Sequence, residues 1–138
     1  MTIKQMSVFL ENKNGRINEV TKVLGEHSIN MHAFSMAETT DFGILRLIVS
    51  DVEHAVEILR EKGYAVILTD VVCISCPNVP SALSEILDNL AKHQIFIEYM
   101  YAFAQENIAH IVIRPSNLEE CVKWLSKEGC NILDKQHL

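Results

Sequence analysis

The sequence predicts an α+β protein built from two tandem ferredoxin-like βαββαβ modules, each an antiparallel sheet that carries both helices on one face. Two observations predict this fold. The spacing of apolar residues switches between the period of a strand and that of a helix, and the whole pattern recurs after 66 positions. The composition agrees, because 49% apolar and 7% aromatic residues are typical of globular domains. We expect the modules over residues 1–68 and 69–138.

Charge and hydropathy exclude several classes of partner. The formal net charge is −6 and no cluster of Lys and Arg occurs, so we expect no nucleic-acid partner. No apolar run comes near the ~20 residues that cross a bilayer, and the first residues lack the pattern of a secretion signal. We therefore expect no membrane partner and a cytoplasmic location. The four cysteines are then expected to be reduced thiols.

The first strand and helix are predicted from a change of period near Gly15. Residues 5–10 alternate in apolar character, which predicts a strand with one face buried. From Arg16 onwards the apolar residues recur every three or four positions, which predicts an amphipathic helix that ends near His27. The expected buried residues are Met6, Val8 and Leu10 on the strand, which alternate with Gln5, Ser7 and Phe9, and Ile17, Val20, Val23 and Leu24 on the helix.

Three more strands and one helix complete the first copy. Residues 29–38 and 43–49 alternate as strands around a turn at residues 39–41. Ser50 and Glu53 match the capping box S-x-x-E, so we expect the second helix to start there and to stop before Gly63. A short strand over residues 64–68 follows. The expected faces are Ile29, Met31 and Ala33 against His32, Phe34 and Met36 on the second strand, and Leu45, Leu47 and Val49 against Ile44, Arg46 and Ile48 on the third; the helix stripe is Val52, Ala55, Val56 and Leu59.

The second half repeats these features in register. Both capping boxes, both helix-stopping glycines and both buried stripes align without a gap, and no Pro/Gly/Ser-rich linker separates the copies. The identical pairs are Asn12/Asn78, Glu19/Glu85, Leu24/Leu90, His27/His93, Ile29/Ile95, Ser50/Ser116, Glu53/Glu119, Val56/Val122, Leu59/Leu125 and Gly63/Gly129, and the second stripe is Leu118, Cys121, Val122 and Leu125. We infer a duplicated module.

The open sheet face of the first copy indicates association. The residues expected there are Phe9, Phe34, Met36, Ile44 and Ile48, beside His32 and Arg46. A small sheet with this much exposed apolar surface is prone to associate. We expect the face to be covered by the other copy or by another chain, and we expect a homodimer.

The loop between the first strand and the first helix is the strongest candidate for a ligand site. Backbone N–H groups at a helix start lack partners within the helix, so they suit a small anion such as a carboxylate. Gly15 has no Cβ and allows a ligand close to the chain. The amides of Asn12 and Asn30 can both donate and accept hydrogen bonds, so the set would suit a zwitterion. Asn also favours turns and helix starts without any ligand.

These residues resemble the ACT-domain family, the βαββαβ modules that sense small molecules for enzymes of amino-acid metabolism. The similarity lies in an Asn, a loop with Gly, an amphipathic helix and a strand that opens with Ile29-Asn30-Met31, and it covers both copies. It implies that the loop backbone holds the carboxylate of an amino acid and that Asn side chains hold the rest. Carried over residue by residue, the resemblance implies Asn12, Gly15 and Asn30. The whole predicted ligand site is Asn12, Lys13, Asn14, Gly15, Arg16, Ile17 and Asn30 in the first copy, and Asn78, Val79, Pro80 and Ser81 in the second.

The two copies depart from the family pattern in different ways. The first has Asn14 where Pro is usual but keeps Gly15. The second keeps Pro80, has Ser81 in place of Gly, and has Phe96 at the position of Asn30. The second copy is therefore the poorer match as a binding site, and its role could be structural.

The thiols and imidazoles have structural interpretations beside functional ones. Cys73 and Cys76 form a C-x-x-C, but residues three apart on a strand point to opposite faces, so we expect packing and no metal. Cys121 falls in a helix core stripe and is expected to be buried. His27 and His93 are interpreted as helix-end residues. His32 and His110 are expected on the open sheet faces, where they could reach a ligand or an interface.

No catalytic constellation is present in the sequence. We find no Ser/His/Asp set, no phosphate-binding glycine loop and no paired carboxylates at a catalytic spacing, and Glu19 and Glu85 fall on polar helix faces. We expect no catalytic residues and no cofactor. The expected function is a stand-alone regulatory protein that binds an amino acid in the cleft between the two ACT-like modules and acts on a partner enzyme of amino-acid metabolism. The alternatives are a dimerisation subunit without ligand binding and a small C-x-x-C metal-binding protein.

Overall fold

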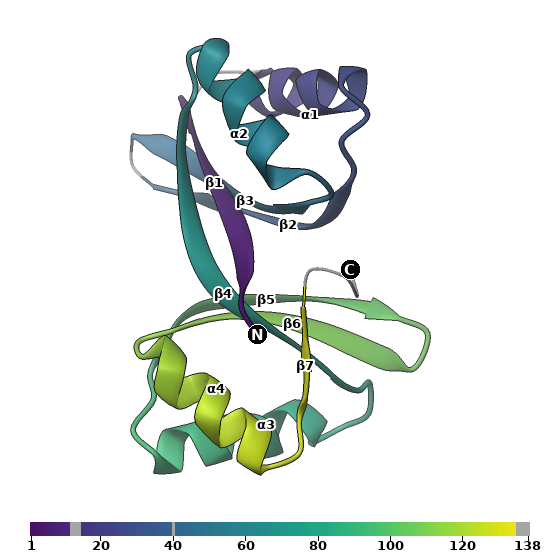
Figure 1. Cartoon of the computed structure of the whole chain (residues 1–138), viewed down its shortest axis with the longest axis vertical. Helices are drawn as coiled ribbons and strands as arrows, with labels where there is room; N and C mark the ends of the chain where they lie inside the picture. The colour runs from purple at the N-terminus through teal and green to yellow at the C-terminus, as the bar shows by residue number, and fades with distance from the viewer. Residues whose placement is uncertain (12–14, 40, 135–138) are drawn as a thin grey trace. The chain divides into compact units, whose positions relative to one another are not determined.

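The computed structural model describes residues 1–11, 15–39 and 41–134, and within them it confirms the α+β fold of two tandem βαββαβ modules. The chain forms two compact units, one of residues Lys4–Thr69 and one of Met1–Ile3 with Asp70–Leu138, which we call module one and module two. The elements are β1 Ile3–Glu11, α1 Arg16–Glu26, β2 Met31–Glu38, β3 Phe42–Val49, α2 Val52–Glu61, β4 Ala65–Pro77, α3 Ala82–Lys92, β5 Ile97–Gln105, β6 Ile108–Pro115, α4 Leu118–Lys127 and β7 Asn131–Leu133 (Figure 1).

Module one is an antiparallel sheet in the order β2-β3-β1-β4, with α1 and α2 together on one face (Figure 1). The strands and helices meet in one core because their apolar stripes face each other. This core contains Met6, Val8 and Leu10 from β1, Val20 and Leu24 from α1, Leu45, Leu47 and Val49 from β3, and Val52, Ala55, Val56, Ile58 and Leu59 from α2. The predicted buried stripe of α2 is confirmed.

Module two repeats the plan with strands β5, β6, β4 and β7 in that order and with helices α3 and α4. Its core includes Val72, Ile74, Cys76, Leu90, Ile111, Ile113, Cys121 and Leu125. One strand, β4, runs across the boundary between the modules. The sequence predicted a short strand that ends at Leu68, but the residues from Thr69 to Cys76 contain neither Gly nor Pro, so nothing interrupts the extended chain.

Strand β1 is buried on both faces. Gln5 and Ser7, which we expected on an exposed face, are buried, and Gln5 Nε2 donates to Ser7 Oγ at 3.3 Å. The side chains of β1 alternate between the two faces as predicted, but the face with Gln5 and Ser7 is buried as well. These two polar side chains are satisfied in part by each other.

The predicted faces of β2 are wrong, because the strand contains an irregularity. The register shifts between Met31 and Ala33, and a shift of one residue moves every following side chain to the other face. Phe34 pairs with Leu47 and Met36 with Leu45, so both lie on the face of the core and not on the open face. They are still 60% and 48% exposed, and Met31 is 36% exposed. The open face of β2 instead presents Ala33, Ser35 and Ala37, paired with Ile48, Arg46 and Ile44.

The predicted capping boxes are displaced by one residue. The N-cap of α2 is Asp51, whose Oδ1 accepts from the backbone N–H of His54 at 3.2 Å. The N-cap of α4 is Asn117, whose Oδ1 accepts from Glu120 at 3.0 Å. Ser50 and Ser116 have another role. Their hydroxyls accept from the backbone N–H of Asn30 and of Phe96, at 3.0 and 3.1 Å, and so attach each helix start to the neighbouring strand.

Left-handed backbone conformations recur at the 66-residue offset, which supports the duplication independently of side chains. The pairs, with their φ angles, are Gly15 and Ser81 (86° and 73°), Ser28 and Gln94 (57° and 60°), and Gly63 and Gly129 (90° and 74°).

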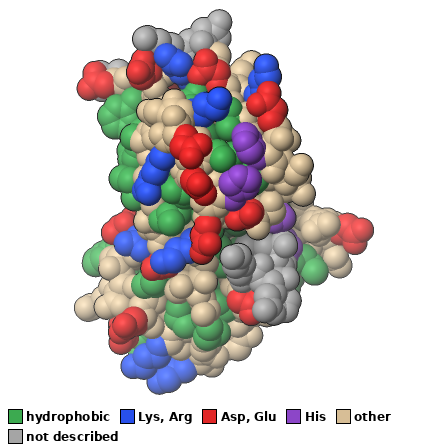
Figure 2. Space-filling view, turned by 45° about the horizontal axis from the view of Figure 1, so that its top comes forward, with side chains coloured by type: hydrophobic (Ala, Val, Ile, Leu, Met, Phe, Trp, Pro, Cys, Tyr) green, Lys and Arg blue, Asp and Glu red, His purple; other side chains and the backbone are tan. Residues whose placement is uncertain are grey.

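In the described part of the chain, no helix combines the length and the apolar character needed to cross a membrane. Acidic and basic side chains are interspersed on the face drawn in Figure 2.

Candidate ligand-binding site

The start of α1 has the backbone geometry that the sequence predicted for a ligand loop. Gly15 is the N-cap in a left-handed conformation with φ of 86°, and as a glycine it has no side chain to cap the helix. The first intrahelical bond runs from Glu19 N to Gly15 O at 3.0 Å, so the N–H groups of the first turn have no acceptor within the helix. The other predicted loop residues, Asn12, Lys13 and Asn14, lie outside the described residues.

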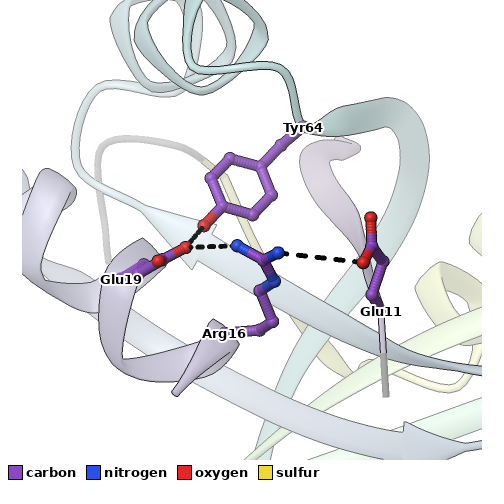
Figure 3. A network of polar contacts seen from close by, with 4 residues as sticks. All are labelled: Glu11, Arg16, Glu19 and Tyr64. Carbon is purple, nitrogen blue, oxygen red and sulfur yellow. Dashed lines mark hydrogen bonds and ion pairs between the residues drawn. The ribbon is translucent and has the colours of Figure 1, made fainter. Parts of the chain in front are cut away.

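A cavity of about 710 Å³ opens beside this helix start. It forms where the end of β1, the first turns of α1 and the connection from α2 to β4 meet (Figure 3). Its size falls within the range usual for small-molecule sites. The lining residues are Phe9, Glu11, Arg16, Glu19, Val23, Lys62, Gly63, Tyr64 and Ala65.

Four of these residues form a polar network (Figure 3). Arg16 Nη1 lies 3.0 Å from Glu19 Oε2, and Arg16 Nη2 lies 3.7 Å from Glu11 Oε2. Tyr64 donates its hydroxyl to the same Glu19 oxygen at 2.5 Å. With Lys62 also in the lining, the cavity presents two carboxylates and two cations. A ligand with charges of both signs would therefore find a partner for each.

The network shifts the pKa values of its members in directions that favour the observed ion pair. The hydrogen bond from Tyr64, and then the one from Arg16, hold the pKa of Glu19 below its ordinary value. Burial, and then the bond to Glu19, raise the pKa of Tyr64. The bond to Glu19 raises the pKa of Arg16. Glu19 is thus held ionised and Tyr64 neutral.

Of the predicted module-one residues that the structure describes, only Arg16 lines this cavity. Gly15 and Ile17 flank it in sequence, and Ile17 packs against the core of module one. Asn30 precedes β2, where its backbone N–H donates to Ser50, and it is not part of the lining. Sequence reasoning missed Glu11 and Tyr64, because Tyr64 lies 45 positions from Glu19 and no local pattern connects them. The i,i+3 spacing of Arg16 and Glu19 was the available signal.

Module two has a cavity of about 450 Å³ at the equivalent place. Eight of the nine positions that line the first cavity have a lining counterpart 66 residues later, all except Val23. The predicted Val79 and Pro80 belong to the lining, whereas Asn78 donates its backbone N–H to Asn107 O at 2.8 Å. The lining residues are Ser75, Cys76, Pro77, Val79, Pro80, Ala82, Glu85, Ile86, Glu128, Gly129, Cys130 and Asn131.

The chemistry of the second cavity differs although its position is the same. Ala82 stands at the position of Arg16, Glu128 at that of Lys62, Cys130 at that of Tyr64 and Pro77 at that of Glu11. The carboxylate of Glu19 is kept as Glu85. Among the described residues of this lining, none is Lys or Arg. The second cavity therefore lacks the cation that a carboxylate ligand needs.

Comparison with known proteins decides the family. The sequence matches the ACT domain pair family over residues 1–138. The chain belongs to the ACT domain pair family. The resemblance inferred from the loop and the duplication is thus confirmed. ACT domains are regulatory modules and not catalytic ones, which fits the lack of a catalytic set in the sequence.

Three solved structures show how widely the architecture of this ACT domain pair occurs. Protein BT0572 from Bacteroides thetaiotaomicron is 52% identical, with a TM-score of 0.93 over 96% of this chain and 92% of its own. The regulatory subunit of aspartate kinase from Thermus thermophilus is 17% identical, with a TM-score of 0.65 over 90% and 91%. A structure of aspartokinase alpha and beta subunits is 17% identical, with a TM-score of 0.63 over 90% of each chain. No curated protein matches the sequence.

The thiols of the second ACT module lie as the strand pattern predicted. Cys76 packs into the core with Val72 and Ile74, so Cys73, three residues earlier, faces the other side of β4. Both are buried, and burial raises the pKa of Cys73 to about 11. In the described ranges, no group of three or more His, Cys, Asp or Glu is placed to hold a metal ion. Cys121 is buried in the core as predicted.

The predicted helix-end histidines of the ACT modules are confirmed. His27 and His93 are the C-cap residues of α1 and α3. His27 Nδ1 lies 2.9 Å from Val23 O, and His93 stacks on Trp124 with 3.3 Å between ring centroids. On the open face of module two, His110 stacks on Phe103 at 4.9 Å. These rings have packing roles.

Proposed function

We propose that this ACT domain pair is a regulatory protein that binds a free amino acid at module one and signals the bound state to a partner enzyme of amino-acid metabolism. The observation that carries the proposal is the cavity at the start of α1, where groups of both charges line one space. A zwitterion needs both, because a buried ammonium or carboxylate without a partner costs several kcal/mol.

The contacts suggest how the zwitterion is held. The ligand carboxylate binds the guanidinium of Arg16 and backbone N–H groups in the first turn of α1, and the ammonium binds Glu11 or Glu19. Both carboxylates are more than half exposed, at 65% and 54%. Exposed ion pairs of this kind contribute little to stability, so a ligand can exchange with them at small cost. The ligand then replaces each member of the internal pair with a group of the same charge.

The relatives support a regulatory role. The chain from Thermus thermophilus is named as the regulatory subunit of aspartate kinase, and it has the same pair of modules over 90% of this sequence. Together with the family match, this likeness favours a protein that acts through an enzyme and not as one. The predicted Asn12 and Asn30 remain candidate contacts for the same ligand.

The proposal is tested first by a thermal-shift screen of the twenty amino acids on the full chain, because a ligand that binds only the folded state raises its apparent stability. Calorimetry then compares Arg16→Gln with Ala82→Gln, its counterpart in module two. Arg16→Gln should weaken binding by about tenfold or more, since a charge-assisted pair is lost. Ala82→Gln should leave the affinity unchanged. A screen without any shift, or equal affinities in both variants, would overturn the proposal.

A second candidate function is assembly of a complex without a ligand. It is favoured by one observation: β2 is at the edge of its sheet and exposes Phe34 and Met36. An edge strand with exposed apolar side chains favours association with another chain, including a second copy. Sedimentation of the wild type and of Phe34→Ser tests this. A dimer that Phe34→Ser dissociates, combined with a negative ligand screen, would favour the assembly function.

A further inference from the structure

The C-terminal strand of module two brings two cysteines opposite each other. Strand β7 pairs antiparallel with β4 through Cys73 and Leu133, Ile74 and Ile132, and Ser75 and Asn131. Each step along β4 is matched by one step back along β7. The next pair in this register is Cys76 and Cys130, the residue immediately before β7.

The two thiols also lie on the same side of the sheet. Asn131 Nδ2 donates to Ser75 Oγ at 2.9 Å, which fixes that pair on the open face. Because side chains alternate, the flanking residues point to the helix face. Accordingly, Cys76 belongs to the core of module two, and Cys130 packs against that core.

The two thiols differ in how accessible they are to solvent. Both line the cavity of module two. Cys76 is 8% exposed, whereas Cys130 is half-buried. A third thiol, Cys121 on α4, is fully buried and does not line the cavity.

The spacing of such a pair is suited to a covalent bond. Residues directly opposite in an antiparallel pair have Cα atoms roughly 4.5–5.5 Å apart. A disulfide needs roughly 4.4–6.8 Å between Cα atoms. The bond could thus form without a change in strand pairing. At the equivalent positions module one has Leu10 and Tyr64, so the pair belongs to module two alone.

We propose that Cys76 and Cys130 form a reversible disulfide that joins β4 to the start of β7 on the wall of the module-two cavity. The proposal is independent of amino-acid binding at module one. With hydrogen peroxide as oxidant, the thiolate of Cys130 attacks one peroxide oxygen, the O–O bond breaks, and a sulfenic acid and hydroxide form. The thiolate of Cys76 then attacks the sulfenic sulfur and displaces the second hydroxide. The two thiol protons convert both hydroxides to water, so two thiols and one peroxide give one disulfide and two waters.

The surroundings of Cys130 make this reaction slow and its product persistent. Burial, then Glu128, then Cys76 raise the pKa of the Cys130 thiol. Little thiolate is present at neutral pH, so attack on the oxidant is slow. The same surroundings do not stabilise the reduced thiolate, which favours the disulfide at equilibrium. The bond would tie together residues 54 positions apart and fix the last strand to the sheet.

The test uses the full chain, reduced and then treated with one equivalent of hydrogen peroxide in mildly alkaline buffer. After alkylation and proteolysis, mass spectrometry should find one peptide pair joined through Cys76 and Cys130, which a thiol reductant separates. Cys73 and Cys121 should be alkylated. The midpoint of thermal unfolding of the oxidised protein should rise by roughly 10 °C over the reduced protein.

Matched variants make the assignment specific. Cys76→Ala and Cys130→Ala should each abolish both the joined peptides and the thermal shift, whereas Cys73→Ala should keep both. The peptide map of the wild type decides the matter even if a variant fails to fold. A Cys121–Cys130 link, a link between two molecules, or oxidation of Cys130 without a cross-link would overturn the proposal.

Discussion

The two cavities of this ACT domain pair occupy equivalent positions in their modules and share almost none of their chemistry. In module one, Arg16 holds Glu11 and Glu19, and Tyr64 completes the network. In module two Pro77, Ala82 and Cys130 stand at the positions of Glu11, Arg16 and Tyr64, and the lining has two carboxylates but, among its described residues, no Lys or Arg. The backbone has been kept more strictly than the side chains. Ser81 even retains the left-handed conformation of Gly15, although a residue with a Cβ is strained there.

The two modules thus share a fold without sharing the side chains that line their cavities. Both cores must be closely packed, and this requirement limits which side chains can occupy core positions. The cavity linings differ more, although some of their residues also pack against the cores, such as Tyr64 in module one and Cys130 in module two. Charged positions of the first lining are replaced in the second, where Pro77 stands at the position of Glu11 and Ala82 at that of Arg16.

Substitutions at equivalent core positions should lower the free energy of unfolding by similar amounts. Leu24 and Leu90 are each 1% exposed and occupy the same place in their modules. Leu24→Ala and Leu90→Ala should each lower the free energy of unfolding by roughly 2–5 kcal/mol, through lost burial and a cavity. Chemical denaturation followed by circular dichroism measures this. A large effect in only one module would mean that the other core is not needed for stability.

Substitutions at equivalent loop positions should have unequal effects on amino-acid binding. Asn12→Ala, in the part of the loop outside the described residues, should weaken amino-acid binding by about 1–3 kcal/mol if the side chain bonds a charged ligand group. Asn78→Ala in module two should change the affinity little. Titration calorimetry with the amino acid found in the screen compares the two. Equal losses would place the site between the copies instead of in module one.

The caps of α2 and α4 should again behave alike. Asp51→Ala and Asn117→Ala should each cost about 1 kcal/mol of unfolding free energy, because a helix N–H loses its acceptor. Thermal unfolding of both variants, with Glu53→Ala as a control for the box predicted at Ser50 and Glu53, tests the assignment. If Glu53→Ala cost more than Asp51→Ala, the cap would lie at Ser50.

The smallest expected effect is on the pH dependence of stability. The pKa of Glu19 is lower in the folded protein than its ordinary value, first because of Tyr64 and then because of Arg16. The folded state thus binds this proton more weakly, so the network stabilises the fold above the ordinary pKa of Glu and loses that effect as the pH falls through the lowered pKa. Glu19→Gln should lower the unfolding midpoint slightly near neutral pH, and the difference from wild type should vanish in acid. Glu85→Gln is the matched control. A difference that grows on acidification would contradict the assignment.

The sequence alone determined the elements and their repetition. Apolar periodicity depends on residues within one or two turns of each other, so the bounds of α1 and α2, the buried stripe of α2 and the duplicated plan could be predicted from the residues themselves. The helix ends at His27 and His93 and the opposite faces of Cys73 and Cys76 followed from the same local rules.

The faces of β2 and the composition of the cavities depend on contacts between distant parts of the chain. A register shift at Met31 depends on how β2 pairs with β3, and it reversed the faces predicted from alternation. The site joins Glu11, Arg16 and Glu19 to Tyr64, which comes from the other end of the module. The proposed bond between Cys76 and Cys130 likewise depends on the pairing of β7 with β4. Contacts between residues so far apart in the chain form only when the strands assemble into a sheet, so no local sequence pattern predicts them.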